Sequence, residues 1–323
     1  MVQLTENDAY SKIMTINIQI IGGDIMAVSG NNYIHEMDRK ALEALKQIPG
    51  FTPLMKGFMK VFNERTFHIL NMSGKVRLSE TQYPHIYALL PPICETLGIK
   101  EPELYLELDR TPNAYTFGDS EVFITITTGL LEYMNEDEIR TVLAHECGHI
   151  ACHHVLYHTM GSFLLSGAAA MLGLDGLFTT ALQLGFSYWE RCSEFSCDRA
   201  AAICAGSPEP VVDVMLRLAG GGKDLGVPVN RDEFISQAME YRQYIQDSTW
   251  NKILEFMILK DQNHPLLSVR AYDIIEWCSS KDFQRVTGLL EDGGAVANAY
   301  CPNCQTEVKP DWMFCQRCGT RLK

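Results

Sequence analysis

The chain is short of positive charge. Its 27 lysines and arginines stand against 40 aspartates and glutamates, which gives a formal net charge of −13. A protein whose main partner is nucleic acid needs a basic face for the phosphates, so this balance argues against such a partner. The sequence also lacks internal repeats and low-complexity tracts, and its 46% of hydrophobic residues is ordinary for a globular protein.

A secretory signal and a disulfide framework are missing as well. The chain opens with MVQLTENDAYSKIMTINIQ, which is polar and mixed instead of basic and then apolar. Seven of the eleven cysteines are scattered singly, and four form two CxxC pairs at the end of the chain. That usage is typical of reduced thiols plus a metal site. We therefore expect a cytoplasmic protein.

No apolar run is long enough to be a clear membrane span. Residues 160–189 come nearest, because Asp175 is their only charged residue. It leaves two halves of about fifteen residues, whereas a helix needs ~20 to cross a bilayer. We predict a buried helical hairpin that turns at Gly173–Gly176. Contact of residues 160–189 with a membrane stays open as the alternative, and would make the protein membrane-associated.

Helices dominate the expected secondary structure. Residue periodicity predicts an amphipathic helix at 36–48 and a second helical stretch at 85–99, which Pro91 and Pro92 interrupt. Alternating apolar residues predict strands at 102–109 and 113–127, and the second run contains a turn signal. The fold class is therefore α+β, mainly helical, with a small sheet directly before the helix that carries the main motif.

A predicted helix over residues 135–158 carries the most informative side chains. It begins with an asparagine N-cap and a capping box. On it, His145 and His149 stand four residues apart, so both imidazoles project from one face and can bind one metal ion. Glu146 lies beside that ion as a candidate base. Together they form the HExxH pattern of zinc peptidases.

A catalytic zinc site needs a third protein ligand and keeps a fourth position open for water. The best candidate is Glu194, on a second predicted helix at 187–205. Asp198, one turn further along, can receive the free N–H of a ligating histidine and fix its orientation. Glu190, one turn in the other direction, is the main rival as third ligand.

The neighbouring histidines and cysteines have plainer interpretations. His153 and His154 stay open as additional ligands, but buried, hydrogen-bonded supports of the site are favoured. We interpret Cys147 as a small apolar residue that fills space in the core, with redox sensing as the alternative. The same interpretation covers Cys152, Cys192 and Cys197.

Several segments resemble the HtpX-type zinc metallopeptidases, a family that includes the CAAX prenyl protease and periplasmic quality-control proteases. They are PNAYTFG, VFITITTGLLEYMNEDEIRTVLAHECGHIACHHV, EFSCDRAA and NHPLLSVR, within roughly residues 38–277. The resemblance implies a zincin-like metallopeptidase domain of the gluzincin type. On it, the zinc ligands are His145, His149 and Glu194, and the base is Glu146.

The resemblance also suggests groups that contact the substrate. His264 and Arg270, in NHPLLSVR, would face the substrate carbonyl or brace the site, and both are candidate catalytic groups. Asn113, Ala114 and Tyr115 would, at a sheet edge, hold an extended peptide by main-chain pairing.

The match to the family has one further agreement and two departures. The family also carries a histidine at the place of His154. Cys197 stands where the family usually has alanine, a change between small residues. The transmembrane helices that bracket the domain in HtpX and the prenyl protease are missing, which puts a membrane-embedded substrate in doubt.

The tail CPNCQTEVKPDWMFCQRCGTRLK is a second predicted metal site. Its two CxxC pairs are separated by ten residues and supply four thiolates, from Cys301, Cys304, Cys315 and Cys318. Four thiolates complete a tetrahedral zinc and leave no place for water, so this zinc is structural. The tail resembles zinc ribbons appended to many bacterial proteins. Docking of a protein partner is the favoured role, with plain stability as the alternative.

The motifs divide the chain into a metallopeptidase domain at 1–290, a linker at 291–299 and a ribbon at 300–323. Within the first, a helical part runs to about 100 and the catalytic core covers about 101–290. We predict a zinc-dependent endopeptidase with one catalytic and one structural zinc, acting on protein or peptide substrates in quality control or regulated processing. The alternatives are a peptide-binding or chaperone-like module with a vestigial site, and an aminopeptidase.

Overall fold

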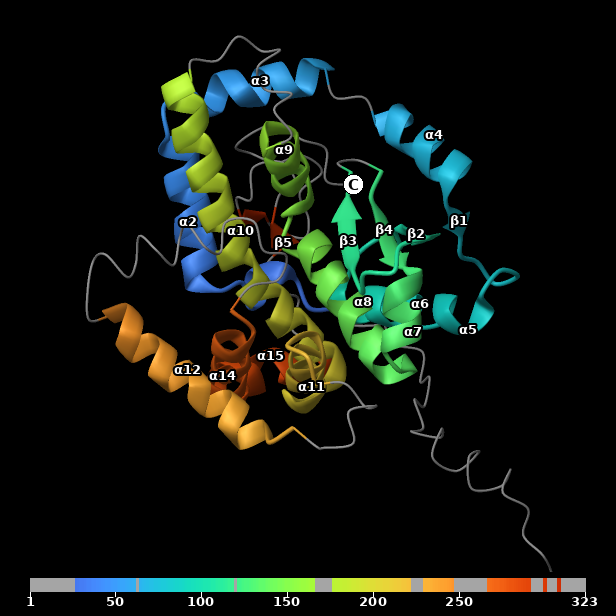
Figure 1. Cartoon of the computed structure of the whole chain (residues 1–323), viewed down its shortest axis with the longest axis vertical. Coiled ribbons are helices and arrows are strands. Elements are labelled where there is room, and N and C mark those ends of the chain that lie inside the picture. Colours follow the sequence, from blue (N-terminus) through green and yellow to red (C-terminus); the bar gives the residue numbers. More distant parts are fainter. Residues whose placement is uncertain are drawn as a thin grey trace, which may run out of the picture.

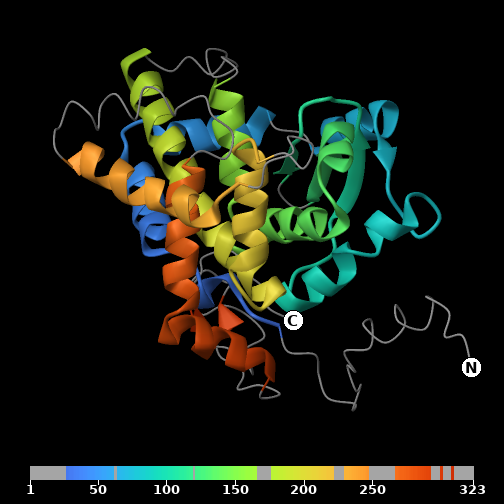
Figure 2. The same cartoon turned by 60° about the horizontal axis from the view of Figure 1, so that its bottom comes forward.

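The computed structural model describes residues 27–61, 64–118, 121–165, 176–221, 229–246, 266–291, 299–300 and 307–308. Within them the protein is mainly helical with a small sheet, as the sequence predicted; the sheet has four strands and is mixed. Figure 1 shows the four-stranded sheet on one side of the molecule and long helices on the other. Figure 2 shows the same division from a second direction. The long helices are α2 (Glu36–Gln47), α10 (Gly176–Ala205), α12 (Arg231–Gln246) and α14 (Leu267–Cys278).

The sheet has the strand order β1-β2-β4-β3. Its strands are β1 (Val76–Arg77), β2 (Glu103–Glu107), β3 (Ala114–Phe117) and β4 (Phe123–Thr127). The two central strands are parallel, and each outer strand pairs antiparallel with its neighbour. All five residues of β4 are buried, which suits a run of β-branched and aromatic residues covered on both faces. β3 lies at the edge of this sheet, where a further strand can pair with it.

The central helix is α8 (Glu136–Ala151), which lies beside β3 and α10 (Figure 1). Its predicted start is confirmed. The Asn135 side chain accepts a hydrogen bond from the amide of Glu138, and the Glu138 carboxylate accepts one from the amide of Asn135. Twelve of the sixteen residues of α8 are buried, so its polar side chains face other protein groups and not bulk water.

The helix predicted over residues 135–158 is interrupted, which corrects the sequence interpretation. α8 ends at Ala151, and His153 adopts a left-handed backbone with φ of 59°. The amides of His153 and His154 donate back to carbonyl oxygens of the last turn at 3.0 and 2.9 Å. This is a Schellman-type end. Because the left-handed residue is a histidine and not a glycine, no breaker in the sequence marked it; α9 (Val155–Leu165) then starts in a new direction.

α10 combines two elements that the sequence suggested separately. The second half of the expected hairpin and the helix at 187–205 form one helix of 30 residues, which ends before Gly206. The turn expected at residues 173–175 lies outside the described residues. The fully buried side chains on the first half of α10 include Leu182, Phe186 and Trp189. No helix among the described residues is both long enough and apolar enough to cross a membrane.

Shorter helices complete the fold. Their bounds are η1 (Gly30–Asn32), α3 (Phe51–Val61), α4 (Glu64–Gly74), α5 (Pro84–Tyr87), α6 (Leu90–Leu97), α7 (Thr128–Tyr133), α11 (Glu209–Leu218) and α15 (Lys281–Glu291). The helix predicted at 85–99 is divided into α5 and α6, because adjacent prolines fall in the first turn of α6. Near the end of the chain, β5 (Ala299–Tyr300) pairs antiparallel with β6 (Glu307–Val308).

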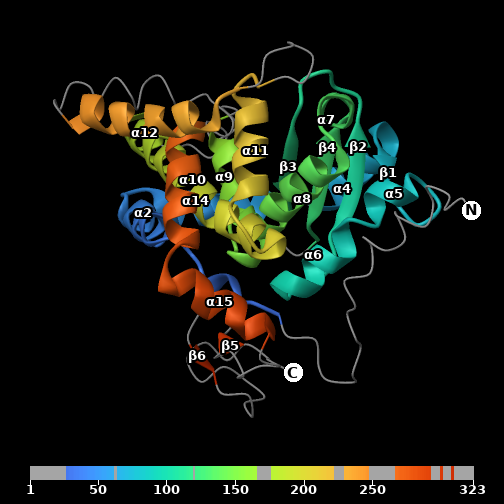
Figure 3. The ribbon, with the colours of Figure 1, turned by 90° about the horizontal axis from the view of Figure 1, so that it is seen from below.

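Apolar clusters hold the central helices in place. The largest lies between the sheet and α6, α8, α10, α11 and α14. A second joins α2, α3 and α9 to the first half of α10. Figure 3 shows α12 and α14 against α10, where Phe195, Ala238 and Val269 form a third, smaller cluster. The facing sides of α8 and α10 therefore lie in the interior.

α8 and α10 pack closely against each other at Gly148. A Cβ built at this position would lie 2.8 Å from the Cβ of Ala200 and 2.9 Å from the Cα of Cys197. Contacts this short leave no room for a side chain at position 148. The close approach brings the carboxylates of α10 within reach of the imidazoles of α8.

Gly148→Ala is expected to lower the free energy of unfolding by roughly 1–3 kcal/mol, because the helices must separate to admit the methyl group. Urea unfolding followed by circular dichroism measures this. Gly288→Ala is the matched control, since Gly288 lies within α15 and a Cβ there would meet nothing within 4 Å. There, alanine should be neutral or stabilising by up to ~1 kcal/mol. Equal effects at both positions would contradict the close packing of α8 and α10.

Candidate metal centre and cleft

The histidines of α8 and Glu194 of α10 face one another in the interior. The Nε2 atom of His145 lies 3.5 Å from Oε2 of Glu194, and the Nε2 atom of His149 lies 3.4 Å from Oε1. Two ligands held tetrahedrally at about 2.1 Å from a zinc ion are about 3.4 Å apart. The spacing and the donor types, two imidazoles and a carboxylate, therefore fit a zinc ion.

Glu190, the rival carboxylate, points elsewhere. A Cβ built at Gly161 would lie 2.6 Å from its Oε1, so the Glu190 carboxylate lies against α9. Burial, reinforced by the charge of Glu194, raises the pKa of Glu190 to about 7. Of the two glutamates considered from the sequence, Glu194 is the one that approaches both histidines.

Cys197 is a further donor close to the histidines. Its Sγ and one nitrogen each of His145 and His149 lie within 4.8 Å of one another. The thiol is fully buried, and burial raises its pKa well above the ordinary value. The buried positions of Cys147, Cys152 and Cys192 agree with the interpretation of these residues as apolar fillers.

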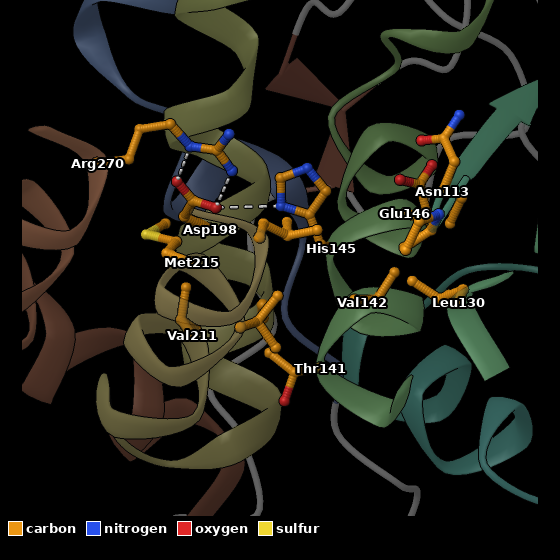
Figure 4. Close-up of a pocket in the computed structure, with 15 residues that line it drawn as sticks. Asn113, Leu130, Thr141, Val142, His145, Glu146, Asp198, Val211, Met215 and Arg270 are labelled. Atoms are coloured by element: carbon orange, nitrogen blue, oxygen red, sulfur yellow. Dashed lines mark hydrogen bonds and ion pairs between the residues drawn. The ribbon is translucent and has the colours of Figure 1, made fainter. Parts of the chain in front are cut away.

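Asp198 and Arg270 brace the donors from behind. Asp198 Oδ1 lies 3.1 Å from Nδ1 of His145, as the sequence suggested. The guanidinium of Arg270 donates two hydrogen bonds to Asp198, at 2.6 and 2.8 Å, and one to Oε2 of Glu194 at 2.8 Å. Figure 4 shows Arg270, Asp198 and His145 joined in this order. Of the two roles expected for Arg270, this geometry favours bracing over contact with a substrate.

Nearby charges and burial shift the pKa values of the site in opposite directions, and the larger of the two effects differs from group to group. Burial disfavours a charged imidazole, yet Glu194 and Asp198 raise the pKa of His145 to about 10. At His149 burial prevails and lowers the pKa. Burial would raise the pKa of Asp198, but Arg270 and His145 hold it below its ordinary value. The carboxylates of Glu194 and Asp198 beside two imidazoles make the site favourable for a cation, and a metal ion would take the place of a proton there.

Glu146 projects from α8 toward the edge strand. The Oγ1 of Thr116, on β3, donates a hydrogen bond of 2.6 Å to Oε2 of Glu146. The carboxylate is thereby fixed at the wall of the cleft, one residue along the chain from His145. Sequence reasoning missed Thr116. The alternation of side chains along a strand could have revealed it, because this alternation puts Thr116 on the same face of β3 as Ala114.

The predicted substrate segment divides between the two faces of β3. Asn113 and Ala114 line the cleft beside Glu146. The side chain of Tyr115 points to the opposite face, where its hydroxyl donates to Glu107 and accepts from Lys75, both at 2.6 Å. A role for Tyr115 in substrate binding therefore rests on its backbone and not on its ring.

A mostly apolar pocket opens beside His145 and Glu146, as Figure 4 shows. Apart from the polar groups of the site, side chains of α7, α8 and α11 form its wall. They include Leu130, Val142, Val211, Val214, Met215 and Leu218. The mostly apolar lining of this pocket suits an apolar side chain.

His154 is fully buried and hydrogen-bonded, in agreement with its interpretation as a support. Its Nδ1 lies 3.3 Å from Nδ1 of His149, and its Nε2 lies 2.9 Å from Oδ2 of Asp38 on α2. His153 is exposed. Sequence reasoning missed Asp38. The sequence feature that could have revealed it is its position: Asp38 is an acidic residue on the buried face of an amphipathic helix, the face that also carries Ala41 and Leu45.

Some predicted site residues lie outside the described residues. They are His264 and the ribbon cysteines Cys301, Cys304, Cys315 and Cys318.

Comparison with known proteins identifies relatives of the chain. The model of peptidase family M48 matches residues 84–277, and that of a zinc-ribbon domain matches residues 300–322. The chain is 31% identical over 263 residues to the plastoglobule-localized metallopeptidase 48, chloroplastic, of Arabidopsis thaliana, covering 80% of this chain and 75% of the relative.

Protease HtpX homologues are also similar to the chain. The one from Campylobacter curvus is 26% identical over 185 residues, and the one from Ralstonia nicotianae is 25% identical over 183 residues. These matches cover 48% and 47% of this chain. The chain spans 63% of the length of each homologue. With its family model matched over more than half of its length and a centre of two histidines and a glutamate, the chain belongs to peptidase family M48 and is a metalloprotease.

Proposed function

We propose that the protein is a zinc-dependent endopeptidase whose catalytic metal is bound by His145, His149 and Glu194. The observation that carries this proposal is the convergence of the two Nε2 atoms on the Glu194 carboxylate, at 3.5 and 3.4 Å. Three protein ligands leave the fourth position of a tetrahedral zinc for water and substrate, the usual arrangement of a hydrolytic site.

His145, His149 and Glu194 would hold a zinc ion that, when bound, would lower the pKa of a water molecule toward about 7 and polarise the scissile carbonyl. Glu146 accepts the proton of the attacking water and later delivers it to the leaving amine. The hydrogen bond from Thr116 holds the carboxylate ready, so the base need not be ordered when substrate arrives.

Two further groups support the reaction from outside the ligand set. Arg270 forms ion pairs with Glu194 and Asp198 and fixes the carboxylate that would bind the metal. His264, by the resemblance of its segment to the His-Pro segment of the family, would donate a hydrogen bond to the developing oxyanion.

The substrate of this enzyme is an extended stretch of polypeptide. β3 is a sheet edge beside Glu146, and an edge strand binds an extended chain by main-chain hydrogen bonds. A side chain next to the scissile bond would enter the apolar pocket. Such recognition reads little of the sequence beyond one apolar residue, which suits degradation of unfolded proteins.

Val142→Phe is expected to fill the pocket, since Val142 lies on its wall and is 9% exposed. Cleavage next to large apolar residues should fall by about 10- to 200-fold, while cleavage next to alanine or glycine changes little. Fluorogenic peptides that differ only in that residue measure the ratio. Val229→Phe, the same change at a position 51% exposed, is the control. Equal loss for all peptides would argue against the pocket as a specificity site.

Digestion of casein with and without phenanthroline tests the overall proposal. New internal termini that disappear with the chelator support an endopeptidase. Trimming from the amino terminus would indicate an aminopeptidase, and binding of casein without cleavage would indicate a chaperone-like module.

The tail and the location of the protein belong to the same proposal. The ribbon at residues 300–323 would hold a structural zinc through Cys301, Cys304, Cys315 and Cys318. It would also dock a protein partner. We place the protein in the cytoplasm with membrane association; exposed apolar side chains of α9 and α10 support the membrane association, namely Leu165, Leu184 and Tyr188. Cell fractionation decides this, since a protein recovered wholly in the soluble fraction has no membrane association.

A further inference from the structure

A chain of buried polar groups runs from His149 away from the cleft to α2. His154 stands between His149 and Asp38, with one ring nitrogen toward each. Asp38 is fully buried, and its carboxylate also contacts Trp189 Nε1 at 2.9 Å and Ser196 Oγ at 2.6 Å. α2 lies outside the residues that match the family model, so the match assigns no role to Asp38.

The partners of Asp38 determine where its neighbours carry hydrogen. An ionised carboxylate only accepts hydrogen bonds, so the Nε2 atom of His154 must be the protonated one. The Nδ1 atom of a neutral His154 is then an acceptor. Two groups approach it, Nδ1 of His149 at 3.3 Å and Sγ of Cys197 at 3.7 Å, and both can donate.

The same reasoning extends to His149. When its Nδ1 carries the hydrogen that points at His154, the lone pair of a neutral ring is on Nε2. That atom is the one 3.4 Å from the Glu194 carboxylate. The relay, which runs from Asp38 through His154 to His149, thus leaves Nε2 of His149 ready to bind a metal and holds the ring in that orientation.

We propose that Asp38 and His154 are positioning residues that fix the tautomer of His149 and strengthen its bond to the catalytic zinc. This inference rests on the proposed function, because it requires His149 to be a zinc ligand. Each ligating histidine then has its own carboxylate. Asp198 contacts His145 directly at 3.1 Å, whereas Asp38 acts on His149 through His154.

The reversal at the end of α8 is what makes the relay geometrically available. Had α8 continued, residue 154 would lie more than one helical turn beyond His149, because it follows His149 by five positions. The left-handed His153 instead turns the chain back, and the amide of His154 bonds the carbonyl of His149 at 2.9 Å. The side chain of His154 can therefore pack beside the ring it orients.

Burial of the charged Asp38 carboxylate is unfavourable, and its hydrogen bonds offset this cost. Burial raises the pKa of an aspartate, yet His154, Ser196 and Trp189 hold the pKa of Asp38 below its ordinary value. An ionised group kept this far from water, and hydrogen-bonded to His154, Trp189 and Ser196, is suited to orienting those donors.

Competition for zinc against a chromogenic chelator, with the full-length chain, tests the proposal. Asp38→Asn should weaken binding at the catalytic site by about 10- to 100-fold, the usual effect of losing a group that orients a ligand. Trp189→Phe and Ser196→Ala each remove another donor to the same carboxylate and leave the contact between Asp38 and His154. These controls should change the affinity by less than about 3-fold, whatever they do to the thermal midpoint.

Nitrogen-15 NMR of the histidine rings in the zinc-loaded wild-type chain gives an independent reading, and it decides the matter even if Asp38→Asn does not fold. The proposal predicts hydrogen on Nε2 of His154 and on Nδ1 of His149. Hydrogen on Nδ1 of His154, or unchanged zinc affinity in Asp38→Asn, would overturn it. Failure of the proposed function is a separate result, in which His149→Ala holds as much zinc as the wild type.

Discussion

Replacing Glu146 with glutamine is expected to lower peptide hydrolysis by a factor of about 10²–10⁴ or more and to leave the zinc content unchanged. Glutamine keeps the size of the side chain but cannot accept the proton of the attacking water. The ligand set of His145, His149 and Glu194 does not include Glu146, so the metal should stay. Rates of casein digestion and zinc analysis by mass spectrometry measure the two effects on the same preparation.

Glu190→Gln is the matched control for this substitution. Glu190 is also a largely buried glutamate near the metal centre, but its carboxylate lies against α9. Its replacement should change the rate by less than a few-fold. Comparable losses in both variants would mean that removing any nearby carboxylate disables the enzyme, and Glu146 would lose its assignment as the base.

Arg270→Met is expected to lower the free energy of unfolding of the metal-free protein by about 3–5 kcal/mol, because it leaves buried carboxylates without their counter-charge. Arg270 is 4% exposed and bonds both Asp198 and Glu194. Zinc binds the folded protein and should recover part of the loss, since its charge replaces that of the guanidinium beside Glu194. Urea unfolding with and without added zinc measures both quantities.

Arg285→Met controls for removal of an arginine as such. Its side chain is 52% exposed and pairs with Asp282 three residues earlier. Exposed pairs of this kind contribute at most about 1 kcal/mol, so the variant should unfold nearly as the wild type does. An Arg270→Met protein as stable as Arg285→Met would show that Arg270 does not brace the site.

The sequence predicted the parts of the site that depend on local spacing. His145 and His149 share a face because a helix repeats every 3.6 residues, and the capping box at Asn135 fixed where that helix begins. The same periodicity put Asp198 one turn from Glu194. Contacts of this kind need no knowledge of the tertiary fold.

Other parts depend on packing between distant segments, and the sequence could not place them. Asp38 lies 116 residues from His154 along the chain, and Thr116 lies 30 residues from Glu146. The end of α8 was also hidden, because a histidine occupies the left-handed position where glycine usually announces a helix end. Such features become visible only once α2, α8 and β3 are assembled around α10.

Anomalous diffraction at the zinc absorption edge, from crystals of the zinc-loaded protein, tests the metal centre most directly. We predict a peak about 2.0–2.2 Å from Nε2 of His145, Nε2 of His149 and a carboxylate oxygen of Glu194, with its fourth position open to water. A peak without Glu194 as a ligand, or with Cys197 in the fourth position, would contradict the hydrolytic centre proposed for this protein.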